Sequence, residues 1–231
     1  AAAVRSPVIR LANAEGGWLV RKEVITKACS IGIPMALESS ALSMAQIVST
    51  RIIAPLGTVA IAAHSFAITA ESICYMPGFG ISSAATTLVG QAVGAKRKDL
   101  ARSFAWLSVF AGMLVMTLTG AVMYIYCPYV FRFLTPVEEV QVLGAKVLRY
   151  ELLAEPLFAA SIVATGALRG AGDTLIPGIM NLISMWGIRL TLAWFLSRTM
   201  GLNGVWIAMA IELSCRGIIF LIRLKREKWL K

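Results

Sequence analysis

The stretch from Ser103 to Phe131, SFAWLSVFAGMLVMTLTGAVMYIYCPYVF, contains no charged residue. A helix needs about 20 mostly apolar residues to cross the hydrocarbon core of a bilayer, so this stretch predicts a transmembrane helix. The composition agrees: 58% of the 231 residues are hydrophobic, 15% are charged, and the mean hydropathy is +0.76. A soluble domain has roughly 25% charged residues. We therefore expect an all-α integral membrane protein that has the lipid bilayer as a partner.

Six apolar segments are separated by clusters of charge. They lie at approximately 27–50, 58–94, 103–127, 143–168, 174–197 and 203–223. Residues 1–26 are expected to form a cytoplasmic loop or amphipathic lead-in, and residues 224–231 a basic cytoplasmic tail. The second segment is too long for one straight span, and Pro77 followed by Gly78 predicts a kink or a break in it. Such a break is typical of a transporter binding site, but it also occurs where helices simply pack.

Basic residues are distributed unevenly between the two ends of these segments. They are dense before the first segment, between the second and third, and after the sixth. The opposite end receives a smaller set: Arg51, Arg132, Lys146, Arg149 and Arg198. Because Lys and Arg concentrate in cytoplasmic loops, both termini are expected in the cytoplasm, which requires an even number of crossings. The net charge of +10 fits an acidic lipid surface. Nucleic acid is not an expected partner, since basic and aromatic residues do not interleave.

Three carboxylates interrupt the apolar segments: Glu38, Glu71 and Glu155. A charge at the bilayer centre costs about 2.5–3.5 kcal/mol on insertion scales unless it is paired, neutralised or solvated. Ionisable residues in such segments indicate an ion, proton or substrate pathway, so all three are candidates for cation or proton coupling. Glu38 and Glu155 are also candidates to hold Na+, and Pro156 would free a backbone carbonyl close to Glu155. The alternative is a protonated carboxyl group that only bonds to a neighbouring helix.

Helical spacing places further polar side chains beside two of these acids. Gln46 lies on the same helical face as Glu38. His64 and Tyr75 share a face with Glu71. Gln46, His64 and Tyr75 are therefore candidates for the lining of a cavity, with core packing as the alternative for His64.

Three other charges within the apolar segments are expected to have structural roles. Glu212 and Arg216 have the favourable i,i+4 order and are expected to neutralise each other. Arg189 has no acidic neighbour in the sequence, so it is expected to pair across helices or to extend toward a membrane interface.

The sequence does not predict an enzyme. It contains no HExxH, GxSxG or P-loop motif. One histidine and four dispersed cysteines make a zinc or haem site implausible, and no cofactor is expected. Without a nucleotide-binding motif, any pumping is expected to use an ion gradient.

Four runs of sequence resemble one known family. They are IGIPMALESS (31–40), IAAHSFAITAESICYMPGFGISSAATTLVGQAVGA (61–95), EPLFAASIVATGALRGAGDTLIP (155–177) and GVWIAMAIE (204–212). In this order they look like the C-terminal half of a multidrug and toxic compound extrusion (MATE) transporter. The resemblance extends from about residue 20 to the end and is greatest to the prokaryotic branch.

The resemblance implies a twelve-helix protein of two six-helix lobes around a cavity that opens alternately to either side. Such transporters export organic cations and other amphipathic compounds in exchange for Na+ or H+. This chain would be the C-terminal lobe, with six transmembrane helices, and the N-terminal lobe would lie outside it, in agreement with a first residue that is not methionine. The expected location is a bacterial or archaeal plasma membrane.

The resemblance also bears on individual residues. Glu38, Glu71 and Glu155 match acidic positions of the family. Some relatives have a cation-site aspartate about one turn after the position of Glu155, where this chain has Phe158. This departure puts an ion site at that turn in doubt, although Glu155 could substitute for the aspartate.

We therefore expect half of a cation-coupled multidrug exporter with small amphipathic or cationic substrates. One alternative is a lipid or lipid-linked oligosaccharide flippase of the same superfamily, which would need a cationic cluster in its cavity, whereas the arginines look scattered in the sequence. Another is a structural membrane subunit whose carboxylates only pack. A third is a homodimer of half-transporters.

Overall fold

The computed structural model describes residues 22–230, and every regular element in that part of the chain is a helix. The helices are α2 (Lys22–Ile53), α3 (Thr58–Gly94), α4 (Lys98–Leu134), α5 (Glu138–Leu152), α6 (Glu155–Gly170), α7 (Leu175–Ile183), α8 (Leu190–Met200) and α9 (Leu202–Lys225). A 3₁₀ turn, η2 (Ala54–Leu56), follows α2, and a π-helical segment, η3 (Ser184–Arg189), joins α7 to α8. The predicted all-α fold is confirmed. Most of the predicted lead-in lies outside the described residues.

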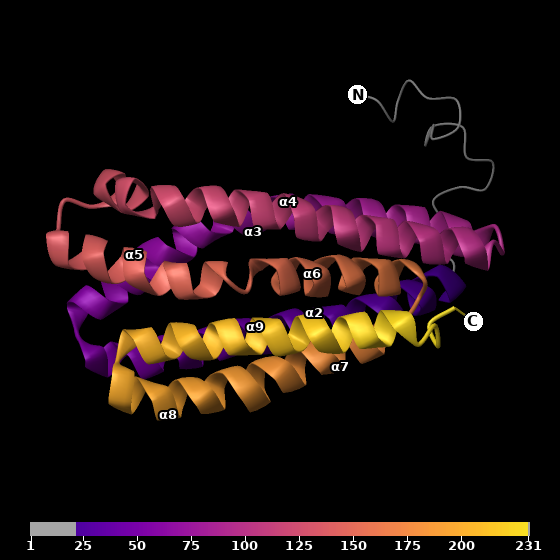
Figure 1. Cartoon of the computed structure of the whole chain (residues 1–231). Helices are drawn as coiled ribbons and strands as arrows, with labels where there is room; N and C mark the ends of the chain where they lie inside the picture. The colour runs from indigo at the N-terminus through magenta and orange to yellow at the C-terminus, as the bar shows by residue number, and fades with distance from the viewer. Residues whose placement is uncertain (1–21, 231) are drawn as a thin grey trace, which may run out of the picture.

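These elements form six rods that lie side by side along one direction (Figure 1). α5 with α6 makes one rod, and α7, η3 and α8 make another. The most extensive contacts join α3 to α4, α3 to α6, α6 to α9 and α4 to α6, so α6 is the central helix of the bundle. The connection from α4 to α5 lies at the end of the bundle away from the C-terminus.

Several of the rods meet the requirements for crossing a membrane. Four helical stretches are long and apolar enough: Thr58–Gly94, Lys98–Leu134, Leu175–Met200 and Leu202–Lys225. The α5–α6 pair, bent by 59°, is a fifth if it is taken as one broken span. The remaining rod, α2, is long enough, with 32 residues and about 48 Å of helix, but it is not among the stretches that are apolar enough.

The break in the helices falls at a different proline from the one that the sequence suggested. α3 is continuous through Pro77, so of the predicted kink or break in the second segment the break is absent. The chain bends instead between α5 and α6, where Pro156 occupies the first turn of α6. Proline is tolerated there because the backbone N–H groups of a first turn have no partner within the helix. Glu155 thus lies directly after the bend.

The outer surface of α4 shows why the bundle needs lipid. Leu107, Phe110, Leu114 and Leu118 recur every three or four residues and are 58–67% exposed. The opposite face of the same helix is also apolar, with Val109, Met116 and Cys127 buried against its neighbours. A helix that is hydrophobic all round is typical of a membrane span or a large core.

Glycines let α6 approach its neighbours closely. A Cβ atom added at Gly217 of α9 would overlap the backbone carbonyl group of Leu157, and one added at Gly170 would overlap that of Thr86. Such small residues are the contact points of membrane helices, because close backbone approach supplies the van der Waals energy of association.

We predict that Gly217→Ala lowers the free energy of unfolding by about 1–3 kcal/mol, since α6 and α9 would have to move apart. The matched control is Gly80→Ala in α3, where no atom lies within 4 Å of the added Cβ, and this change should leave stability equal or slightly higher. Equilibrium unfolding in detergent, followed by circular dichroism, measures both. Equal effects of the two substitutions would contradict the packing of α6 on α9.

Candidate functional site

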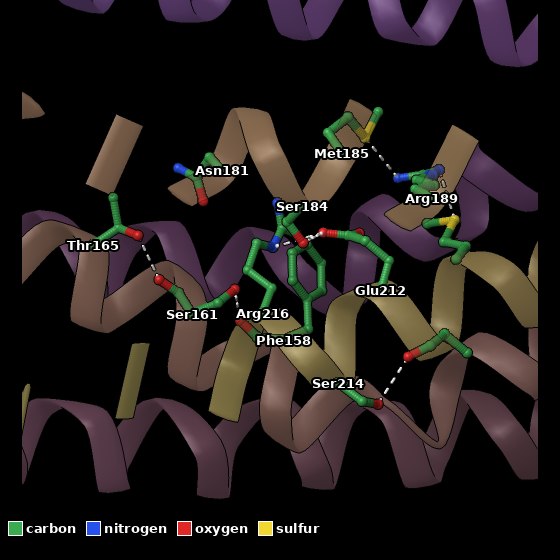
Figure 2. A network of polar contacts seen from close by, with 12 residues as sticks. Phe158, Ser161, Thr165, Asn181, Ser184, Met185, Arg189, Glu212, Ser214 and Arg216 are labelled. Atoms are coloured by element: carbon green, nitrogen blue, oxygen red, sulfur yellow. Dashed lines mark hydrogen bonds and ion pairs between the residues drawn. The ribbon is translucent and has the colours of Figure 1, made fainter. Parts of the chain in front are cut away.

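A large cavity lies between the helices, with walls from α2, α3, α6, the α7–η3 rod and α9. Its volume is about 800 Å³. Five charged side chains line it: Glu38, Glu71, Arg169, Arg189 and Arg216. Hydroxyl groups and aromatic rings complete the wall, among them Ser161, Thr165 and Phe158 (Figure 2). We call this space the central cavity.

Glu38 is bound by two side chains that are distant from it in the sequence. The guanidinium Nη2 of Arg169 donates to both of its carboxylate oxygens, at 2.9 and 2.8 Å. The Asn181 side-chain amide donates to Oε1 at 2.9 Å. Because the Glu38 side chain is only 7% exposed, this ion pair provides most of the compensation for its charge. Gly178 lies against the same carboxylate, and a Cβ atom there would come within 2.9 Å of Oε2.

A second ion pair joins two residues of α9, as the i,i+4 spacing predicts. Arg216 Nε lies 3.3 Å from Glu212 Oε1, and Ser184 Oγ donates to the same oxygen at 2.5 Å. The Glu212 side chain is fully buried, while the Arg216 side chain reaches the central cavity and is 14% exposed. The Arg216 guanidinium also lies 5.5 Å from the centre of the Phe158 ring. Figure 2 shows these groups converging from α6, η3 and α9.

Arg189 is the least compensated cation of the central cavity. Its guanidinium donates to the sulfur atoms of Met185 and Met209, at 3.8 and 2.8 Å, and thioether sulfur is a weak acceptor. Among residues 22–230 it has no carboxylate within ion-pair distance, yet it is only 6% exposed. Glu71, Glu151 and Glu212 lie within electrostatic range of it. The expectation that Arg189 pairs across helices is therefore met by diffuse interactions and not by a direct salt bridge.

Three buried carboxylates lie within electrostatic range of one another beside the central cavity and are called the carboxylate cluster, although no three acidic, histidine or cysteine side chains of the described residues are placed to hold a metal ion together. Glu71 comes from α3, Glu151 from the end of α5 and Glu155 from the start of α6. They interact electrostatically with one another. Glu151 and Glu155 are completely buried, and within residues 22–230 none of their four carboxylate oxygens has a hydrogen-bond partner. Only Glu71 reaches the central cavity, so the cluster touches the cavity through one member.

The predicted cavity-lining residues separate into two groups. Gln46 and Tyr75 line the central cavity. His64 does not, and the structure corrects that prediction. It is 5% exposed and packs edge-on against Trp206 of α9, with the ring centres 5.7 Å apart. Helical spacing places His64 on the same face as Glu71, but the two residues lie about two turns apart, beyond the end of the cavity.

Sequence reasoning missed several residues of the site. In the sequence Arg169 falls between the fourth and fifth apolar segments, where a loop is expected, but it lies in the last turn of α6 and binds Glu38. Asn181 could have been noticed as an amide in an apolar segment. Glu151 lies early in the fourth apolar segment, four residues before Glu155, and that position suggests a solvated place near an interface, but its side chain is fully buried. The bend before Glu155 explains this error, since it turns the end of α5 into the bundle.

We predict that Arg169→Met lowers the free energy of unfolding by about 3 kcal/mol, because it leaves the Glu38 carboxylate buried without its counter-charge. Adding Glu38→Gln should restore much of that loss. A double-mutant cycle in detergent measures the coupling energy, which we expect to exceed about 1 kcal/mol. The control is the Arg102–Glu227 pair, whose side chains are 60% and 39% exposed and should couple by about 0.2–1 kcal/mol. Equal coupling in the two pairs would contradict this account of Glu38.

Comparison with known proteins places this cavity in a family. Residues 34–195 match the sequence model of the family described as MatE. The probable multidrug resistance protein NorM of Thermotoga maritima is 30% identical over 218 residues, which cover 93% of this chain and 46% of that protein. The protein of the same name from Agrobacterium fabrum is 31% identical over 223 residues, or 91% and 47% of the two chains.

Solved structures share the fold. The Vibrio cholerae MATE transporter VcmN in its bent form matches with a TM-score of 0.84 at 16% identity, over 92% of this chain and 48% of that one. The chain thus spans about half the length of the relatives that it matches. It belongs to the MatE family, whose members are transporters and not enzymes, and forms one lobe of the MATE fold.

Proposed function

We propose that this chain is the C-terminal lobe of a secondary active multidrug exporter, which exchanges amphipathic or cationic compounds for Na+ or H+. A second six-helix lobe would close the central cavity. We place the transporter in a bacterial or archaeal plasma membrane with both termini of this chain in the cytoplasm. The names of the NorM relatives and their length support this proposal.

The observation that carries the proposal is the charge balance of the central cavity. Arg169 is neutralised by Glu38, and Arg216 by Glu212. Arg189 interacts at a distance with Glu212, which already pairs with Arg216, and with Glu71, so Glu71 supplies the third negative charge. If Glu151 and Glu155 are neutral, the three arginines are balanced by three carboxylates, those of Glu38, Glu212 and Glu71. The net charge of the site then depends on whether Glu71 is ionised.

This balance provides a mechanism for antiport. When Glu71 is ionised, the charges around the cavity sum to zero. A cationic cargo can then bind, because the Glu71 carboxylate attracts it. When Glu71 gains a proton or binds a cation, Arg189 is uncompensated and repels the cargo. Cargo and coupling ion thus compete for the same negative charge, which is a reciprocal coupling between two ligands.

Glu155 and Glu151 provide further carboxylates inside the bundle to which the coupling ion could move from Glu71. Two buried carboxylates four residues apart, on either side of the bend, cannot both carry charge cheaply away from water, because no hydrogen bond from the described residues stabilises either. We therefore propose that this pair exchanges its proton or cation with Glu71. Glu38 remains a third coupling candidate, but its ion pair with Arg169 makes it better suited to fix the shape of the cavity than to exchange ions.

The test uses ethidium efflux from vesicles that contain the complete transporter, with Na+ and pH gradients imposed separately. We predict that Glu71→Gln and Glu155→Gln each reduce gradient-driven efflux by about 5- to 150-fold, the usual range of coupling between two ligands. Glu38→Gln should weaken ethidium affinity, because it leaves Arg169 uncompensated. Glu139→Gln, which changes an exposed residue in the first turn of α5, is the control and should have no effect. Undiminished efflux in both Glu71→Gln and Glu155→Gln would refute the coupling role.

One observation favours a second candidate, a lipid or lipid-linked oligosaccharide flippase. The arginines that looked scattered in the sequence gather in the cavity wall, where Arg169, Arg189 and Arg216 could face a pyrophosphate group. Translocation of a fluorescent lipid-linked pyrophosphate across the same vesicles separates the two candidates. The exporter requires ethidium efflux without lipid translocation, and the opposite result would select the flippase.

A further inference from the structure

A second cavity, separate from the central one, lies between α4 and α5 at the end of the bundle away from the C-terminus (Figure 1). Its volume is about 530 Å³, and it shares no lining residue with the central cavity. Helical spacing explains its shape. Tyr124, Pro128 and Arg132 recur every four residues along α4, and Val142, Lys146 and Arg149 lie on the facing side of α5. We call this space the interfacial groove.

The interfacial groove carries an excess of positive charge. Arg132, Lys146 and Arg149 line it, against a single carboxylate, Glu138. Among the described residues, none of the three cations forms an ion pair. Arg149 is held in place by a hydrogen bond from its Nε to the Tyr124 backbone carbonyl, at 3.3 Å, and its guanidinium lies 5.2 Å from the centre of the Tyr124 ring. The groove therefore has a surplus of two positive charges.

The position of this charge is unusual for a membrane protein. Lysine and arginine concentrate on the cytoplasmic side. The groove, however, lies at the opposite end from the basic α3–α4 connection and the basic C-terminal segment. Three cations that gather at this end, without carboxylate partners, indicate a binding role for an anion.

Helix length places the interfacial groove at the level of the lipid headgroups. α4 has 37 residues and is about 55 Å long, whereas the hydrocarbon core is about 30 Å thick, so roughly 12 Å of helix extends beyond it at each end. Four of the five tyrosines in the chain lie in this region: Tyr124, Tyr126, Tyr129 and Tyr150. Tyrosine is enriched at membrane–water interfaces, where its ring lies among the headgroups.

The border of the groove is apolar where it faces the membrane. Leu153 is 73% exposed and Val142 is 65% exposed, and both line the groove. Ile125, which is 66% exposed, follows Tyr124 on α4. A ligand with an anionic head and hydrocarbon chains would match this combination, because its head would meet the cations while its chains remain in contact with exposed apolar side chains.

We propose that the interfacial groove binds an anionic phospholipid, with its phosphate held by Arg132, Lys146 and Arg149 and its acyl chains along Val142 and Leu153. Arginine and lysine are the usual partners of phosphate, and basic pockets between transmembrane helices bind anionic lipid headgroups. The surplus of two positive charges suits a headgroup with one or two phosphates.

The test is native mass spectrometry of the purified protein, released from nanodiscs that contain equal amounts of phosphatidylglycerol and phosphatidylcholine. We expect retained lipid to be mostly phosphatidylglycerol. The triple variant Arg132→Gln, Lys146→Gln, Arg149→Gln should retain at least about fivefold less of it, a change of about 1 kcal/mol. The control, Lys225→Gln, Arg226→Gln, Lys228→Gln, removes the same charge from exposed positions near the C-terminus and should retain phosphatidylglycerol like the unaltered protein.

A second variant guards against loss of folding in the triple variant. Val142→Trp fills the groove without changing its charge and should also reduce retention of phosphatidylglycerol. Equal retention of the two lipids by the unaltered protein would overturn the proposal, as would a triple variant that behaves like the control. Complete displacement of the lipid by millimolar inorganic phosphate would identify the groove as a site for a free anion and would equally overturn it.

Discussion

The cost of holding charge away from water governs the whole arrangement of this bundle. Each ionised group in a low-dielectric interior must find a partner, exchange a proton or bind an ion. Glu38 and Glu212 use the first solution, with Arg169 and Arg216 as partners. Among the described residues, Glu71, Glu151 and Glu155 form no ion pair, and this difference separates carboxylates that shape the cavity from those suited to carry a coupling ion.

Arg189 connects the two groups of carboxylates. It lines the central cavity, donates within the described part of the chain only to methionine sulfurs, and interacts at a distance with Glu212, Glu71 and Glu151. The extent to which its positive charge is compensated therefore depends on whether Glu71 is ionised. The affinity of the cavity for a cationic cargo depends in turn on that compensation. The bend before Glu155 makes this possible, because it brings two acids of α5 and α6 into the same buried region as Glu71.

The positions of the helices could be predicted from the sequence, but the contacts between side chains of different helices could not. The uncharged run in α4 and the charge clusters between segments suffice to locate the rods, because the bilayer imposes strict limits on length and polarity. The i,i+4 pairing of Glu212 with Arg216 follows from helical geometry alone. Arg169 is 131 residues from Glu38, however, and Asn181 is 143 residues from it, and spacing within one helix cannot indicate which other helix will face it.

The same limitation explains the two errors at the site. His64 and Glu71 share a helical face, but the cavity ends before it reaches His64, and a periodic pattern contains no information on how far a cavity extends. Glu151 appeared to be near water because it lies early in the fourth segment, and the sequence did not reveal that the segment is two helices with a bend of 59°.

The central claim is that cargo and coupling ion compete for the negative charge of the Glu71 cluster. The most direct measurement is a titration of the purified complete transporter with ethidium in weak buffer, with the H+ and Na+ that it displaces counted at the same time. We predict that each bound ethidium releases up to one H+ or Na+ and that Glu71→Gln abolishes the release. Ethidium binding that releases neither ion, with an affinity independent of pH and Na+, would contradict the account.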